Sequence, residues 1–256
     1  MPPIYIMAAI TLALGAGLGG GLVYLMSGRR RSVLWLLAAG LPLSALVNLV
    51  VKRPLVLWLG EVGGVEPNLG LATPLWFIVA VALVPPVTEE AIKALPLLLP
   101  AVRRHISDLS SALSTGMALG ISFGLGEAAY LAYNVARAPA YAGYPWYAFT
   151  GYLGERLAVM LAHGLLTALF VAGIWAGRWQ AAAGYLGAVL LHLLINAGAI
   201  LASLELISPA AASLSLLAGL AILAILFERL RATATRSGEG KDGAEEVVYF
   251  RRDRER

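Results

Sequence analysis

Seven long apolar runs constrain the fold of this chain more than any other feature of its sequence. An α-helix crosses a bilayer with about 20 apolar residues, and each run is close to that length. Of the 256 residues, 59% are hydrophobic and 13% are charged, whereas soluble domains have about 45–50% and about 25%. The composition therefore excludes a soluble enzyme, a disordered chain and a nucleic-acid-binding domain. It predicts an all-α polytopic helix bundle in a lipid bilayer, with spans at 3–27, 33–51, 74–100, 109–135, 153–176, 181–204 and 210–227.

Polar segments divide the chain into one membrane domain and a tail. The domain covers residues 1–230, and its core at about 74–204 carries the buried polar residues. Residues 231–256 are dense in charge, and we expect a tail that is disordered or helical only in part. Residues 55–71 contain several glycines and two glutamates and are predicted to form a loop. The aromatic stretch 137–152 is expected to lie in the headgroup layer of the bilayer.

The basic residues predict an orientation. Cytoplasmic segments of membrane proteins carry an excess of Lys and Arg. Most of the 19 Lys and Arg residues fall on the cytoplasmic side if the N-terminus lies outside. On the outer side, Lys52 and Arg53 are interpreted as an interfacial anchor, and Glu155 and Arg156 as a local pair. The sequence thus predicts a multi-pass plasma-membrane protein with a cytoplasmic C-terminus.

Several polar side chains lie inside the predicted spans, near one depth. A charged side chain in the membrane interior costs roughly 2.5–3.5 kcal/mol or more, so it is expected to be functional and paired. The third to sixth spans each place an acid or an imidazole within about two helical turns of the same plane. Polar residues that have no common role would be expected at different depths in the membrane. The candidate residues are Glu89, Glu90, Lys93, Glu127, His163, His192 and, one turn from His192, Asn196.

The charges of this cluster do not balance. Lys93 lies at i,i+3 from Glu90 and at i,i+4 from Glu89, so it neutralises only one carboxylate well. With Glu127 as the third carboxylate, a formal charge of −2 is left. Either the carboxylates share protons, or a divalent cation completes the balance.

The residue types limit which metal and which nucleophile the cluster can use. The chain has no cysteine, so the nucleophile is water and a metal is held by carboxylate and imidazole. His163, His192 and Glu127 form a His₂Glu set, which with one water is a known catalytic zinc arrangement. Zn²⁺ is therefore the candidate cofactor.

Four short features resemble those of the PrsW-type intramembrane proteases. Residues 89–93, EEAIK, resemble their EExxK motif, and residues 123–127, FGLGE, resemble FxxxE. His163 sits where they carry a helix histidine, and residues 192–196, HLLIN, resemble their His followed four residues later by Asn or Asp. The related CAAX-prenyl endopeptidases and bacteriocin-processing proteases have EExxxR and FxxxH instead. The matched stretch runs from about residue 85 to 197, leaving the first, second and last spans outside it.

The resemblance implies a membrane-embedded endopeptidase that cleaves a membrane-anchored protein. We take Glu89 as the base that activates the attacking water, because Glu90 is expected to pair with Lys93. Asn196 helps to hold the carbonyl oxygen. The family is grouped with metallopeptidases, whereas its CAAX relatives are argued to work without a catalytic metal, so the resemblance leaves zinc open. The catalytic residues it implies are Glu89, Glu90, Glu127, His163, His192 and Asn196.

Two other functions fit the same residues. A proton- or cation-coupled transporter also uses buried Glu and His residues and Pro-broken helices, although no internal repeat stands out here. A non-catalytic scaffold would use the cluster only to fix helix register. Pro85 and Pro86 leave two local structures open: a kink within one helix, or a new helix with Thr88 as its cap.

Overall fold

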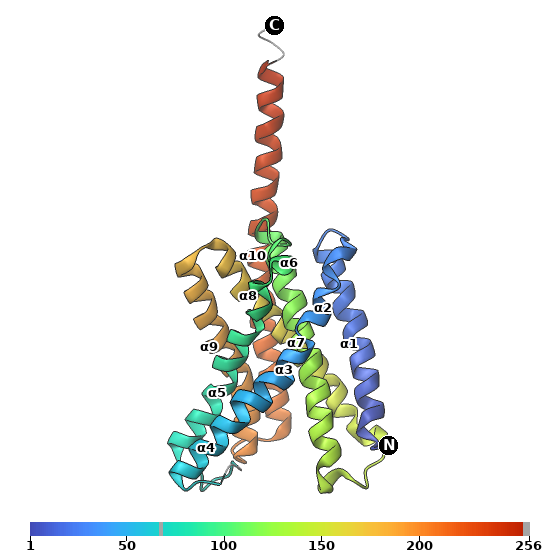
Figure 1. Ribbon diagram of the computed structural model, residues 1–256, viewed down its shortest axis with the longest axis vertical. Coiled ribbons are helices and arrows are strands. Elements are labelled where there is room, and N and C mark those ends of the chain that lie inside the picture. The colour runs from blue at the N-terminus through green and yellow to red at the C-terminus, as the bar shows by residue number, and fades with distance from the viewer. Residues whose placement is uncertain (67–68, 253–256) are drawn as a thin grey trace.

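The computed structural model describes residues 1–66 and 69–252, with side chains described up to residue 236. In this part of the chain seven helical segments are long and apolar enough to cross a membrane, which confirms the predicted all-α polytopic bundle. Helix α1 begins at one end of the bundle, and α10 extends beyond the opposite end (Figure 1). The spans are α1 (Ile4–Met26), a composite second span over Arg31–Gly63, α5 (Leu75–Lys93), α7 (Leu109–Arg137), α8 (Thr150–Ala176), α9 (Arg178–Ser203) and the first part of α10 (Pro209–Arg252).

The second span is a series of short helical pieces. Its main break is at Gly40, whose N–H donates to the Ser122 hydroxyl of α7 at 2.9 Å. The same hydroxyl donates to the Leu37 carbonyl at 2.5 Å, so α7 supplies partners for the broken backbone, as membrane burial requires. The pieces are η1 (Arg31–Val33), α2 (Leu36–Ala39), α3 (Leu41–Val47), the π-helical turn η2 (Asn48–Lys52) and α4 (Arg53–Gly63).

The predicted end of the second span and much of the predicted loop at 55–71 are wrong. The helix continues past Lys52 through η2 into α4 and ends at Gly63, before Gly64 in a left-handed conformation (φ +62°). Pro54 does not end the helix: it lies at the start of α4, directly after the π-helical turn, and the chain stays helical through it. Lys52 and Arg53 therefore lie within the span rather than at its outer end.

Helix α5 passes through both of its prolines without ending. Pro85 and Pro86 lie inside a helix that continues to Lys93. Thr88 does not cap a new helix, because its hydroxyl donates to the Val84 carbonyl of the preceding turn at 2.7 Å. Two short helices follow α5: η3 (Leu95–Leu98), which still belongs to the third span, and α6 (Pro100–Arg103).

Helix α7 is the centre of the bundle. Every residue from 112 to 126 is buried, and α7 packs most extensively against α8. Gly116 and Gly124 face α8 so closely that an added Cβ would lie 2.6 Å from Ala168 Cα and 2.7 Å from Met160 Cα, respectively. Small residues at this spacing let membrane helices approach closely. The α7 N-terminus is closed by a capping box at Asp108.

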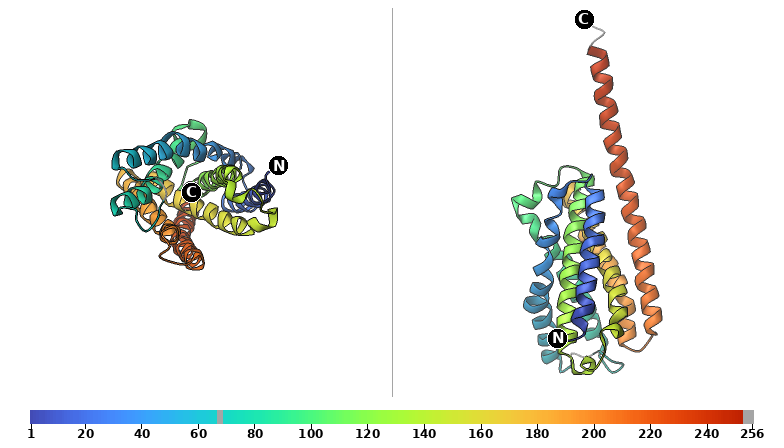
Figure 2. Two further views of the ribbon diagram at one scale, coloured as in Figure 1. Left: turned by 90° about the horizontal axis from the view of Figure 1, so that it is seen from below. Right: turned by 90° about the vertical axis from the view of Figure 1, so that its right-hand side faces the viewer.

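The last three spans form one side of the bundle. Helices α8 and α9 pack against each other, and α10 packs against both. The connection into α8 contains the short helices η4 (Pro139–Tyr141) and η5 (Trp146–Phe149) and carries exposed aromatic rings. Figure 2 shows α10 running along the bundle and extending beyond its end.

Helix α10 continues to Arg252. It runs into the tail at 231–256 that the sequence predicts to be disordered or helical only in part, of which residues 253–256 lie outside the described part of the chain. Ala, Arg and Glu are common in this segment and are good helix formers. Arg231 also pairs with Glu228 one turn earlier, with Nε 2.9 Å from the carboxylate, a spacing that supports exposed helices.

Replacing Gly120 by alanine should separate α7 from α8. A Cβ at Gly120 would overlap the backbone of His163 and Gly164, which cannot rotate away. We expect a loss of about 1–3 kcal/mol of stability, as for other overpacked sites, measured by thermal unfolding in detergent. Gly17→Ala in α1 is the control, because no atom lies within 4 Å of its added Cβ. Equal stability of both variants would show that this contact does not govern helix packing.

Candidate active site

One face of α5 carries the EEAIK motif into the bundle. Pro86, Glu89, Glu90 and Lys93 follow the spacing i, i+3, i+4, i+7, and all four are buried, whereas Val87 between them is exposed. Residues at this spacing share one helix face. That face packs mainly against α9, so the sequence places all three charged groups in the protein interior rather than in lipid.

Glu90 connects Lys93 with His192. Its Oε1 accepts hydrogen bonds from Lys93 Nζ at 2.6 Å and from His192 Nδ1 at 2.7 Å. The predicted pairing of Glu90 with Lys93 is thereby confirmed, and both side chains are fully buried. Because Nδ1 of His192 donates, the free lone pair of the neutral ring is on Nε2.

Lys93 also fixes His163. The Lys93 ammonium lies 2.7 Å from His163 Nδ1, and an ammonium only donates, so Nδ1 accepts and Nε2 carries the proton. Nε2 lies 3.2 Å from Glu127 Oε2, which also accepts from Arg156 at 3.2 Å. The Phe123 ring packs edge-on against the His163 ring, with centroids 5.2 Å apart. The imidazole is therefore held on three sides.

Glu89 has one occupied oxygen and one free oxygen. Its Oε1 accepts from Lys52 Nζ at 2.5 Å. Its Oε2 is buried and has no hydrogen-bond partner among the described residues. This oxygen lies 3.9 Å from His192 Nε2, which is beyond hydrogen-bond distance. Both atoms are thus available to a third group.

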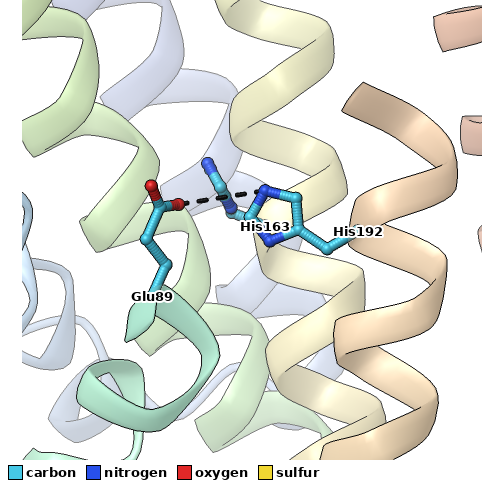
Figure 3. A group of neighbouring side chains, drawn as sticks. All are labelled: Glu89, His163 and His192. Atoms are coloured by element: carbon cyan, nitrogen blue, oxygen red, sulfur yellow. Dashed lines mark ion pairs between the residues drawn. The ribbon is translucent and has the colours of Figure 1, made fainter. Parts of the chain in front are cut away.

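Glu89, His163 and His192 point toward one another from α5, α8 and α9 (Figure 3). One donor atom from each lies within 4.8 Å of the other two. The predicted metal ligands were His163, His192 and Glu127. The structure brings both histidines together, but with Glu89 as the carboxylate. Glu127 does not converge here because its Oε2 is bonded to His163 and Arg156.

These donors fit a divalent metal. One carboxylate and two imidazoles form the ligand set of known catalytic zinc sites. His192 fits directly, because Nε2 is free and a carboxylate holds its other nitrogen, as is usual for metal-bound histidines. The unpaired Glu89 Oε2 is a buried oxygen that lacks a partner. His163 would supply the third donor atom. The ring nitrogen that binds the metal would have to give up its present contact, which is with Lys93 for Nδ1 and with Glu127 for Nε2.

A cavity of about 500 Å³ reaches the imidazoles from one side. It lies among the fourth to seventh spans, and its lining residues come from α7 to α10. Asn196 lines it, on the same face of α9 as His192, and its amide makes no hydrogen bond with another described residue. The polar residues lining the cavity include Glu127, Glu155, Arg156, His163, His192, Asn196 and Ser213.

The expected charge of −2 is wrong. Lys52 neutralises Glu89, and Arg156 neutralises Glu127 at 3.2 Å as well as Glu155 at 2.7 Å. With Lys93 on Glu90, each of the three carboxylates in the cluster has a cation. The charge balance therefore does not by itself require a metal. The argument for one rests on the free donor atoms.

Sequence reasoning missed Lys52 and Arg156 as members of the site. Both were assigned to the outer interface, and the pair between Arg156 and Glu155 is confirmed but incomplete. A signal for Lys52 was present: apolar residues continue after Pro54, so Lys52 lies in the middle of a longer apolar segment. The unbalanced carboxylates were the second signal, since buried charges are normally paired.

Comparison with known families identifies the chain. It matches the family described as PrsW family intramembrane metalloprotease over residues 28–227. The chain belongs to the PrsW family. No curated protein and no solved structure shows significant similarity to it. The match extends well beyond the expected stretch of 85–197 and includes the second span and most of the seventh.

Membership of the PrsW family makes the chain an intramembrane peptide hydrolase. The matched region includes Lys52 and all candidate catalytic residues, namely Glu89, Glu90, Glu127, His163, His192 and Asn196. The transporter interpretation is not favoured, because the family is one of metalloproteases.

Replacing Lys93 by methionine should destabilise this PrsW protein strongly. The change leaves the fully buried Glu90 carboxylate without its cation, and breaking a buried pair costs about 3–5 kcal/mol. Thermal unfolding in detergent measures the loss. The double variant Lys93→Met/Glu90→Gln should recover part of it, because no uncompensated charge is left. If the double variant is no more stable than Lys93→Met, the ion pair is not the origin of the effect.

Proposed function

We propose that this PrsW protein hydrolyses a peptide bond of a membrane-anchored protein by means of a water that Glu89 activates, either as the base or as a ligand of a catalytic metal. The observation that carries this proposal is the free Oε2 of Glu89, buried and facing the free Nε2 of His192 at 3.9 Å. A general base must be within reach of the proton that it takes. Glu90 is less suited, because its Oε1 already binds Lys93 and His192.

The cavity supplies the other parts of the reaction. A substrate segment in the cavity would place its carbonyl oxygen near Asn196, whose unbonded amide would donate to the oxyanion. Glu89 takes a proton from water, and the oxygen of this water forms a bond to the carbonyl carbon. Breakage of the C–N bond leaves a carboxylic acid, which keeps the second proton of the water, and an amine, whose nitrogen takes the proton held by Glu89. Glu127 and Lys93 keep the His163 ring in place throughout.

Glu89, His163 and His192 would hold a catalytic metal. Zinc at such a site lowers the pKa of bound water to about 7 and polarises a carbonyl. In that arrangement the Glu89 oxygen is a ligand, and Glu90 Oε2, also buried and unpaired among the described residues, is the carboxylate oxygen left to accept the proton. We further propose that the protein lies in the plasma membrane with its C-terminus in the cytoplasm, as the sequence predicts.

Glu89→Gln and His192→Ala should each abolish cleavage while the protein stays folded. Glutamine cannot take a proton from water, and alanine removes the free Nε2. The assay is cleavage of a single-span membrane protein that is labelled on both sides of its span and cut by the wild type in the same vesicles. Glu61→Gln on α4 is the control, because Glu61 is exposed and has no ion pair among the described residues.

Full activity in Glu89→Gln or His192→Ala would overturn the assignment. A scaffold role predicts a different pattern, in which both variants lose thermal stability along with activity. Proton-coupled uptake into vesicles that Glu89→Gln abolishes would instead support a transporter.

Removal of the metal should stop cleavage. Because two imidazoles and one carboxylate converge, we expect purified protein to contain about one divalent ion per chain, measured by elemental analysis. Chelator-treated protein should lose both metal and activity, and Zn²⁺ should restore both. His192→Ala should contain little metal. Activity that persists in metal-free protein would contradict the metal assignment and leave Glu89 acting with the histidines alone.

A further inference from the structure

We propose that Lys52 is the positioning residue of Glu89, and that the π-helical turn η2 exists in this chain to bring it there. The inference rests on the proposed role of Glu89. Lys52 is not among the residues that line the cavity. It acts through Glu89, by fixing which carboxylate oxygen is occupied and which is free.

The contact between the two residues has the geometry that orients a carboxylate. Lys52 Nζ lies 2.5 Å from Oε1 of Glu89, and the Glu89 side chain is only 2% exposed. With Oε1 held, the carboxylate cannot turn its occupied oxygen toward the imidazoles. Oε2 therefore stays free and directed at His192. Charge-assisted hydrogen bonds of this kind are about twice as strong as neutral ones.

The backbone of η2 explains how Lys52 reaches Glu89. Val47, five residues earlier, is buried in a cluster with Leu43 and Phe123 and packs beside Ile92 of α5. In a regular α-helix of 3.6 residues per turn, Lys52 would lie about 140° away from the Val47 face. In η2 the Arg53 N–H bonds to the Asn48 carbonyl, the i→i+5 pattern of a π-helix, in which one turn holds more residues than in an α-helix. The wider turn rotates Lys52 toward the Val47 side of the helix, where it pairs with Glu89 of α5.

The two basic neighbours of this segment show the effect of the turn. Lys52 is partly buried, with a side chain 16% exposed, and is ion-paired. Arg53 is exposed and makes no ion pair with another described residue. Of the two adjacent cations, Lys52 therefore belongs to the charged cluster, whereas Arg53 lies at the exposed surface. A π-helical turn inside a helix is often found at a functional site.

The test is Lys52→Met compared with Arg53→Met. Loss of a residue that orients a catalytic group typically costs 10–100-fold, so we expect Lys52→Met to lower kcat by 10–100-fold with KM little changed. Lys52→Arg, which keeps the positive charge, should recover most of kcat. Arg53→Met should match the wild type. The substrate is the doubly labelled single-span protein used for Glu89→Gln.

A double-mutant cycle separates positioning from a structural role. The thermal stability lost in Lys52→Met should be largely recovered in Lys52→Met/Glu89→Gln, whereas the loss in kcat should not be, because both residues serve one step. If Lys52→Met keeps the wild-type kcat, or if Arg53→Met is equally impaired, the inference is wrong. If Glu89→Gln is fully active, the proposed function fails first. An inactive Glu89→Gln with a normal Lys52→Met overturns only the role of Lys52.

Discussion

The site depends on one electrostatic constraint: each carboxylate placed in the membrane interior needs a cation within bonding distance. An unpaired buried charge costs several kcal/mol. Lys52, Lys93 and Arg156 meet this requirement from three different spans, at 2.5, 2.6 and 3.2 Å from Glu89, Glu90 and Glu127. The pairing therefore also fixes how the helices are arranged. The second span cannot slide past α5, or α8 past α7, without breaking an ion pair in the hydrocarbon.

This constraint explains which parts of the structure could be predicted. Apolar runs give the spans, because a helix is the way for a single segment to satisfy its backbone in lipid. The i,i+3 spacing gives the pair of Glu90 and Lys93, since both lie on one helix. The pairs that join two helices could not be placed from spacing. For Lys52 the obstacle was specific: its direction depends on one π-helical turn, which no residue type encodes.

Packing around the charged cluster also explains why Pro85 and Pro86 do not end α5. Pro85 and Pro86 remove two backbone donors from α5 and would end a helix in water. In the bundle the helix continues, because the tertiary contacts of the following turn require Glu89 and Glu90 on one face. The Val87 carbonyl, in the turn after the prolines, accepts from the Tyr185 hydroxyl of α9 at 2.9 Å, which ties this turn to the neighbouring helix. Packing around the charged cluster thus overrides local propensity.

The site has two sides with different tasks. On the α3–α4 side, Lys52 holds Glu89 in a dry environment where ion pairs are strong. On the α8–α10 side, the cavity gives water and peptide a route to His192 and Asn196. A protease in a bilayer needs both, because hydrolysis consumes water whereas a preorganised charge cluster loses strength when water enters. Glu89 lies between the two sides, with Oε1 in the dry one and Oε2 toward the imidazoles. The cut is therefore expected where a substrate segment meets the inner end of the cavity.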